Sequence, residues 1–402
     1  MHSFFLSLHY MHKSITLLIA IIAAALGAFA AESAGVTVGA ARSDLYMPLL
    51  KGKRIGLLTN HTGMVGSEHT LDLLLRLGAD VRIIFSPEHG LRGTADAGEH
   101  VSGGRDEATG LPVESLFGAR RYPSAEAVGA VDIFVTDLQD VGLRFYTYYC
   151  TMLDVMNTAA EAGKPFMVLD RPNPNGMTVD GPVLDMRFSS GVGRLPVPVV
   201  HGMTLGELAR MAVGEGWLKG GRTLDLTVIP CDGYTHSTRY ELPVAPSPNL
   251  LTMKAVYLYP SICLFEATPM SLGRGTDAPF CVIGSPALKG KPGCTFSFTP
   301  RSRTGARRPP LMDRRCYGRD LRTVSDSAAI AGGLDLSYLI EMYRLSGRPA
   351  KFLTPFFEKL IGTDRIRPMI ERGDSAEAIR ATWRDEVEAF RRRRAPYLIY
   401  PE

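Results

Sequence analysis

The residues best suited to chemistry follow an apolar run at 81–85, in the stretch FSPEHGLRG (85–93). Glu88 and His89 come directly after a Ser-Pro break in that run, and glycines follow them. This pattern is typical of a buried strand that opens into a loop. Glu88 would then stand at the carboxyl end of a strand, where open α/β sheets bind their ligands. A partly desolvated carboxyl there suits general acid catalysis, whereas a loop Glu bound to a helix start or an Arg is the structural alternative.

A second carboxylate, Glu266, opens the stretch FEATPMSLGRGT (265–276). Glycines on both sides of Arg274 would let the backbone approach a ligand closely, and an Arg binds acidic groups well. Glycosidases typically place two carboxylates across the bond they cleave, so Glu88 and Glu266 are a candidate catalytic pair. The alternative is a buried Glu266 that only pairs with Arg274.

Polar clusters follow four predicted strands, namely those that precede Asn60, Glu88, Asp140 and Asp170. Several such clusters at one sheet edge predict a lined crevice. The stretch at 136–149 also interleaves charged groups with aromatic rings, which suits a sugar. The alternative is that its tyrosines are core residues of a helix. The candidates for substrate binding are Asn60, His61, His89, Asp137, Asp140, Arg144, Tyr146, Arg171, Asn175, His201, Arg274 and Thr276.

The elements that must position these residues alternate between strand and helix. Predicted strands lie at 54–59, 81–85, 131–138, 165–169 and 224–229, and predicted helices at 70–77, 146–163 and 204–217. Apolar strands separated by helices indicate a parallel sheet covered on both faces, so residues 45–255 are predicted to form a Rossmann-like catalytic domain. The first strand is not followed by G-x-G-x-x-G, so no dinucleotide is expected.

The pattern changes after residue 255. A segment at 285–320, rich in Pro, Gly and Arg, predicts loop or irregular sheet, and helices are predicted at 336–345, 355–361 and 376–392. Residues 256–402 are therefore predicted to form a smaller α+β C-terminal domain, with the active-site cleft between the two domains.

The composition sets limits on function. The 402 residues are 45% hydrophobic and 21% charged, as in ordinary globular proteins, and the net charge of +4 gives no reason to expect nucleic acid. The spacing of His61, His89 and His201 matches no zinc motif, so no metal is predicted. The six cysteines favour buried free thiols, and Cys294 with Cys316 is the pair to check for a disulfide.

The N-terminus predicts export. Lys13 precedes a short apolar run (15–26), and Ala28-Phe29-Ala30 matches an A-x-A cleavage site. These features indicate a signal peptide spanning residues 1–30, and hence a periplasmic or secreted protein with no stable membrane insertion after cleavage. A membrane anchor is the alternative, but it needs about 20 apolar residues.

Six stretches together resemble the NamZ-type exo-β-N-acetylmuramidases. They are LLTNHTG (57–63), FSPEHGLRG (85–93), TDLQDVGLRFYTY (136–148), LDRPNPNG (169–176), PVVHGMTLGELA (198–209) and FEATPMSLGRGT (265–276). Ala267 departs from the pattern, where a glycine is expected. The resemblance implies a Rossmann-like catalytic domain, a smaller C-terminal domain and an active site in the cleft between them.

The same resemblance implies a reaction. It is the hydrolysis of β-1,4-linked N-acetylmuramic acid from the non-reducing end of peptidoglycan fragments, without a cofactor. Glu88 would be the catalytic acid and Glu266 a candidate second carboxylate. Arg144, Arg171 or Arg274 would bind the lactyl carboxylate of the sugar, and Asn60, Asp140 and Asn175 would hold its hydroxyls and acetamido group. The alternatives are a non-catalytic wall-binding protein, or an amidase or esterase acting on wall fragments.

Overall fold

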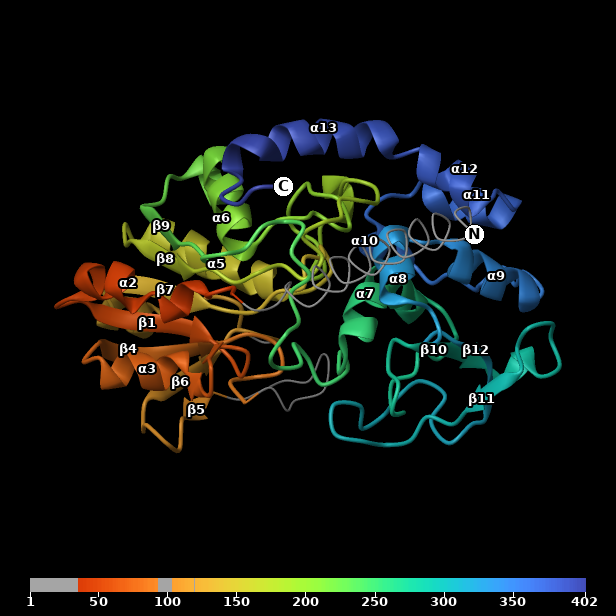
Figure 1. The fold of residues 1–402 in the computed structure, drawn as a ribbon, viewed down its shortest axis with the longest axis horizontal. Coiled ribbons are helices and arrows are strands. Elements are labelled where there is room, and N and C mark those ends of the chain that lie inside the picture. Colours follow the sequence, from red (N-terminus) through yellow and green to blue (C-terminus); the bar gives the residue numbers. More distant parts are fainter. Residues whose placement is uncertain (1–34, 93–102, 119) are drawn as a thin grey trace, which may run out of the picture.

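The computed structural model describes residues 35–92, 103–118 and 120–402. Most of the strands of the described chain belong to one seven-stranded sheet (Figure 1). The strands of this sheet are β1 (Arg54–Thr59), β4 (Asp80–Ser86), β5 (Gly104–Arg105), β6 (Pro112–Ser115), β7 (Ile133–Asp137), β8 (Phe166–Leu169) and β9 (Leu226–Ile229). Their spatial order is β5-β6-β4-β1-β7-β8-β9, and every neighbouring pair is parallel except β5 with β6. Counted along the chain, the six parallel strands lie in the order 3-2-1-4-5-6, which is the doubly wound Rossmann order.

Both faces of the sheet are buried because its strands carry apolar side chains on both sides. In β1, Leu57 belongs to a cluster with residues of α2 and α3, whereas Leu58 belongs to the cluster that contains α4, α5 and α6. Successive side chains of a strand point to opposite faces, which explains this division. The helices are α2 (Ser43–Leu50), α3 (Thr70–Arg76), α4 (Ala125–Ala130), α5 (Tyr148–Glu161) and α6 (Leu205–Gly214). The predicted fold class is therefore confirmed.

Local signals in the sequence account for several element boundaries. The predicted strand at 54–59 matches β1 residue for residue. The start of α6 is a capping box, in which the Thr204 side chain accepts from the Glu207 N–H and the Glu207 side chain accepts from the Thr204 N–H. A short hairpin of β2 (Met64–Val65) and β3 (Glu68–His69) connects β1 to α3. Short 3-10 turns η1 (Gly39–Ala41), η2 (Met186–Phe188) and η3 (Lys219–Gly221) complete this part.

The C-terminal part combines helices with a three-stranded antiparallel sheet, which lies at the opposite end of the molecule from the large sheet (Figure 1). Its strands, in the order β10-β12-β11, are β10 (Val282–Ser285), β11 (Phe296–Phe298) and β12 (Cys316–Asp320). Its helices are α7 (Met253–Ile262), α8 (Asp326–Gly332), α9 (Ser337–Leu345), α10 (Phe356–Ile361), α11 (Ile366–Arg372), α12 (Ala376–Ala381) and α13 (Arg384–Arg394), with 3-10 turns η4 (Cys263–Ala267), η5 (Pro286–Leu288) and η6 (Ala395–Tyr397).

The two parts pack into one body. A single hydrophobic cluster runs from Leu58 in β1 to Phe390 in α13. Helix α13 extends from the helices of the C-terminal part back to α6 (Figure 1), where the buried guanidinium of Arg394 donates to the carbonyl oxygens of His201 and Gly202. The last residues of the chain therefore stabilise the N-terminal part.

Three segments differ from the sequence-based expectation. The helix expected at 376–392 is two helices, because the chain breaks at Trp383 (φ −114°, ψ 6°), whose indole N–H donates to Asp180 at 2.9 Å. Helix α7 was missed because it contains Pro260, a residue that normally argues against a helix interior. Strand β6 was missed because only one of its four residues is buried.

Two predictions concern the cell envelope. The predicted signal peptide lies outside the described residues, among which no helix is long and apolar enough to cross a membrane. All six cysteines lie within the described ranges, where each is buried and free, Cys294 and Cys316 included. The prediction of buried free thiols is confirmed.

Candidate active site

Glu88 is presented by a tight turn at the end of β4. The N–H of Gly90 donates to the carbonyl of Pro87 at 3.1 Å, and the buried His89 between them has a left-handed backbone with φ of 70°. A non-glycine residue in this region costs about 1–3 kcal/mol, and such strain gathers at functional sites. The hydroxyl of Thr147, just before α5, donates to Glu88 Oε2 at 2.6 Å. The turn therefore positions the backbone of Glu88, and Thr147 orients its carboxylate.

Glu266 comes from the other part of the molecule. It lies in η4, which continues α7, and Arg274 Nη2 donates to its Oε1 at 2.6 Å. The guanidinium of Arg274 stacks over the ring of Phe280, 5.0 Å from its centroid. The expected pairing of Glu266 with Arg274 is present, but it does not remove the carboxylate from solvent, because a quarter of the Glu266 side chain stays exposed.

Both carboxylates line two adjoining pockets, of about 100 and about 410 Å³, which are called here the inner and outer lobes of one cavity. The two lobes share four lining residues, namely Glu88, Thr147, Val192 and Glu266. The smaller, inner lobe is rich in aromatic side chains, namely Phe145, Tyr146, Tyr148, Tyr259 and Phe280. The larger, outer lobe is lined by Leu116, Phe117, Arg121, Asp154, Arg194 and Phe356, among others. Aromatic faces beside two carboxylates suit the binding and cleavage of a sugar.

Three of the predicted binding residues line the inner lobe: His89, Tyr146 and Arg274. The hydroxyls of Tyr146 and Tyr148 both donate to the carbonyl of Pro246, at 2.7 and 3.0 Å. Their hydroxyls thereby anchor the two rings, which meet edge to face with centroids 4.7 Å apart. Tyr146 is thus a wall residue of the cavity as well as a core residue.

Asn60 and His61 stabilise the end of β1. The Asn60 side-chain oxygen accepts from the backbone N–H and the hydroxyl of Thr62, at 3.0 and 2.6 Å. The His61 ring bonds the carbonyl of Ala245 at 2.9 Å, and burial lowers its pKa. Neither residue lines the lobes of the cavity.

Asp137 and Arg171 form a buried ion pair at the carboxyl ends of β7 and β8. Arg171 donates to the two carboxylate oxygens at 2.5 and 2.9 Å and to the carbonyl of Met64 at 3.0 Å, and the Thr70 hydroxyl also donates to Asp137. Both side chains are almost fully enclosed. Strand β7 borders the switch point of the sheet, which lies between β1 and β7, so a buried ion pair stands beside the place where Rossmann folds bind ligands.

Arg144 is also a structural residue. Its buried guanidinium donates to the carbonyls of Pro182, Val197 and Leu360 at 2.8, 2.8 and 3.0 Å, and burial lowers its pKa to about 10. These bonds tie the base of the 183–197 loop to the end of α10. The side chain has no exposed surface with which to bind a substrate.

The remaining predicted residues stabilise turns. The carboxylate of Asp140 accepts from the Gly142 N–H at 2.7 Å, and burial raises its pKa to about 7. Asn175 donates to the Val141 carbonyl at 2.8 Å. The ring of His201 accepts from the Met203 N–H at 3.2 Å, and burial lowers its pKa to about 3. The Thr276 hydroxyl donates to the Gly273 carbonyl at 2.7 Å.

Comparison with known proteins identifies the family. The model of the N-terminal domain of the exo-β-N-acetylmuramidase NamZ matches residues 55–254, and the model of its C-terminal domain matches residues 257–400. The chain belongs to the NamZ family. It is similar to the peptidoglycan β-N-acetylmuramidase NamZ of Bacillus subtilis, with 40% identity over 378 residues that cover 88% of this chain and 89% of that protein.

Two crystal structures of DUF1343 family proteins from Bacteroides fragilis share this fold. The first is 51% identical, with a TM-score of 0.86 over 92% of this chain and 100% of the other. The second is 28% identical, with a TM-score of 0.78 over 91% of this chain and 99% of the other. The NamZ fold thus extends over both parts of the molecule described above.

Sequence reasoning missed several residues that line the cavity of this NamZ-family protein. Thr147 stands inside one of the stretches that carried the resemblance, but no pattern marked it as a partner of Glu88. Val192 and Arg194 belong to the irregular 183–197 loop, and Arg121 to the connection between β6 and α4. Loops without periodicity offer no signal for which side chains meet.

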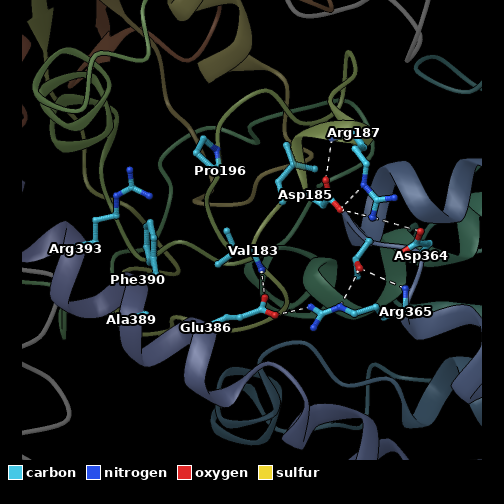
Figure 2. A pocket seen from close by; sticks show the side chains of 12 residues that line it. Val183, Asp185, Arg187, Pro196, Asp364, Arg365, Glu386, Ala389, Phe390 and Arg393 are labelled. Carbon is cyan, nitrogen blue, oxygen red and sulfur yellow. Dashed lines mark hydrogen bonds and ion pairs between the residues drawn. The ribbon is translucent and has the colours of Figure 1, made fainter.

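A further pocket of about 500 Å³ lies between the same 183–197 loop and α13 (Figure 2). Most of its charged groups pair with one another. Arg187 binds Asp185 at 2.6 Å and reaches Asp364 at 3.5 Å, and Arg365 binds Glu386, which also accepts from the Val183 N–H. Arg393, the remaining charged group of the lining, pairs with Glu215 outside the pocket. Each charged group thus has a partner, so the pocket offers no strong site for a charged ligand. Among the described residues, no cluster of His, Cys, Asp and Glu is arranged to hold a metal ion.

Proposed function

We propose that this protein is an exo-acting glycosidase that releases β-1,4-linked N-acetylmuramic acid from the non-reducing end of peptidoglycan fragments. One observation carries the proposal. Glu88 and Glu266, from different parts of the molecule, line one cavity together with aromatic rings that suit a sugar. Membership of the NamZ family and the similarity to a peptidoglycan β-N-acetylmuramidase support the same reaction.

We propose a role for each of the two carboxyls. Glu88 donates a proton to the glycosidic oxygen as the bond to the anomeric carbon breaks, and the Thr147 hydroxyl holds its carboxyl group in place. Glu266, oriented by Arg274, acts either on the anomeric carbon or on the attacking water. Water supplies the hydroxyl group of the released sugar. A carboxyl separation near 5 Å would correspond to retention of configuration and about 6.5–9.5 Å to inversion, unless the acetamido group of the substrate is the nucleophile.

We also propose that the protein acts outside the cytoplasm, in the periplasm or after secretion, in turnover of the cell wall. The basic residue, apolar run and A-x-A site within residues 1–30 support export. Peptidoglycan-derived saccharides are the expected partners. Cell fractionation with antibody detection of the mature N-terminus tests this part, and an uncleaved cytoplasmic protein would contradict it.

The reaction is tested with a chromogenic β-N-acetylmuramide, run beside the matching β-N-acetylglucosaminide. Wild-type protein should release the chromophore from the muramide, and Glu88→Gln should lose this activity. Glu107→Gln removes an exposed carboxylate that does not line the cavity and should behave as wild type. If folded wild-type protein binds the sugar without turnover, the protein is a binding protein. If it releases peptide rather than sugar from wall fragments, it is an amidase.

A further inference from the structure

The proposed substrate differs from N-acetylglucosamine by one substituent, a lactyl ether that ends in a carboxylate. An enzyme selective for N-acetylmuramic acid therefore needs a cationic group that faces the cavity. Arg144 and Arg171 do not meet this need, because their guanidinium groups are buried and bonded to backbone carbonyls and to Asp137. The arginines that do line the two lobes are Arg121, Arg194 and Arg274.

Two of these three arginines are already paired. Arg274 bonds Glu266 at 2.6 Å and stacks over Phe280. Arg194 forms an ion pair with the carboxylate of Asp154, of which only 4% of the side chain is exposed. Burial raises the pKa of Asp154, while the neighbouring Arg194 acts in the opposite direction. Each of these charges is compensated by a neighbouring carboxylate.

Arg121 differs from both. It lies on the connection between β6 and α4, its side chain is exposed, and it forms no ion pair or hydrogen bond with any residue in the described ranges. Its guanidinium reaches across the outer lobe to the 183–197 loop, because a Cβ on Gly191 would lie 4.0 Å from Arg121 Nη2. Its charge also acts on Asp154. Arg121 and Arg194 thus both act on Asp154, while Glu88 and Glu266 are the other carboxylates of this lobe. Within the described ranges, Arg194 has an ion-pair partner and Arg121 has none.

We infer that Arg121, with the paired Arg194 beside it, binds the lactyl carboxylate of N-acetylmuramic acid and thereby determines specificity for that sugar. This inference rests on the proposed function and goes beyond it by naming the selective contact. The planar fork of a guanidinium matches the two oxygens of a carboxylate, and such charge-assisted bonds are stronger than neutral ones. Arg121 does not take part in bond cleavage, so its effect is on binding.

The test compares N-acetylmuramic acid with its methyl ester, which lacks the negative charge and carries one more methyl group. Isothermal titration calorimetry on wild-type protein should show that the acid binds about 10- to 100-fold more tightly than the ester. In Arg121→Ala the acid should bind only as well as the ester, and the affinity for the ester should not change. Arg121→Lys should keep part of the preference, because it keeps the charge and loses the fork.

Arg120→Ala is the matched control. Arg120 is the preceding residue, carries the same charge and pairs with Glu114 at 3.4 Å, but it does not line the cavity. This variant should retain the full preference for the acid. Arg121 is exposed, so thermal melting should show all the variants folded. Equal binding of acid and ester by wild-type protein, or a preference that survives in Arg121→Ala, would overturn the inference.

Enzyme kinetics provide a second readout. They also distinguish binding of the lactyl carboxylate from binding of a peptide carboxylate. With the chromogenic muramide, Arg121→Ala should raise KM by the same 10- to 100-fold and leave kcat within about threefold. If the variant loses affinity only for muramic acid whose lactyl group carries a peptide, Arg121 binds a peptide carboxylate and the inference is wrong. If wild-type protein hydrolyses no muramide, the proposed function fails, but the comparison of acid and ester still decides this inference.

Discussion

The carboxyl ends of β4 and β8 have the same sequence signature, but one end lines a cavity and the other is buried. Each is an apolar strand that ends in a carboxylate and a basic residue, Glu88-His89 after β4 and Asp170-Arg171 after β8. The end of β4 opens onto the cavity. The end of β8 is sealed, since Asp170 accepts from Thr204, Gly206 and Tyr400 at 2.7, 2.9 and 2.7 Å.

What covers each strand makes the difference. The start of α6 and the C-terminal tail lie over the end of β8, and the tail is held there by Glu207, which accepts from the N–H of Ile399 at 2.8 Å. Across from the end of β4 lies η4, which brings Glu266 and leaves space between them. An apolar strand followed by polar residues therefore predicts the end of a strand, and tertiary packing decides whether that end is a site.

The largest expected effect is that of Glu88→Gln on activity, which should come with almost no loss of stability. Glu88→Gln should reduce kcat/KM for the muramide by about 10²- to 10⁴-fold, because a positioned acid is lost. Its midpoint in urea should stay near that of wild type, because the amide can still accept from Thr147. A clearly lower urea midpoint for the variant would mean that Glu88 is a structural carboxylate, like the buried Asp170.

Asp137→Asn should show the opposite behaviour at the sealed edge. The substitution leaves the buried Arg171 without its charge partner, which should lower the free energy of unfolding by about 3–5 kcal/mol. Urea unfolding measures this loss. The folded fraction should keep its kcat, because Asp137 does not line the cavity. Loss of kcat at unchanged stability would place Asp137 in the site instead.

The pH dependence of stability sharpens the comparison at Asp170. Burial raises its pKa from 3.8 to about 6, so the folded state binds this proton more tightly than the unfolded state. Its contribution to stability is present below about pH 4 and is lost as the pH rises to about 6. The advantage of wild type over Asp170→Asn should therefore shrink across this window, by about 3 kcal/mol at most. A constant difference from pH 4 to 7 would contradict this account.

Tyr400→Phe tests the cover itself, and the expected effect is smaller. The Tyr400 hydroxyl donates to Asp170 and accepts from the Cys231 N–H at 2.9 Å, so its removal should cost about 1–3 kcal/mol. Tyr397→Phe removes a hydroxyl that bonds Glu215 at 3.2 Å in a partly exposed place, and should cost less. Equal melting temperatures for the two variants would show that the tail does not seal the end of β8.

Local chemistry made much of the fold readable from the sequence. Apolar periodicity predicted the main strands, and the pair Thr204 and Glu207 predicted the start of α6. The break at Ser86-Pro87 predicted where β4 ends, and hence that Glu88 stands at the edge of the sheet. These features depend on residues that are close together in the sequence, so a single stretch contains the information.

Only the tertiary structure decided which polar groups face a cavity. From the sequence, Arg144 and Arg171 were as plausible as any other arginine as ligands of the substrate carboxylate. In the structure both are buried, Arg144 bonded to backbone carbonyls and Arg171 to Asp137. Arg121 had no local signal, yet it lines the cavity of Glu88 and Glu266. The sequence by itself determined the elements and the strand ends, because short-range sterics and hydrogen bonding govern them. The site brings together side chains that lie far apart in the sequence, such as Glu88 and Glu266, and no local pattern encodes that arrangement.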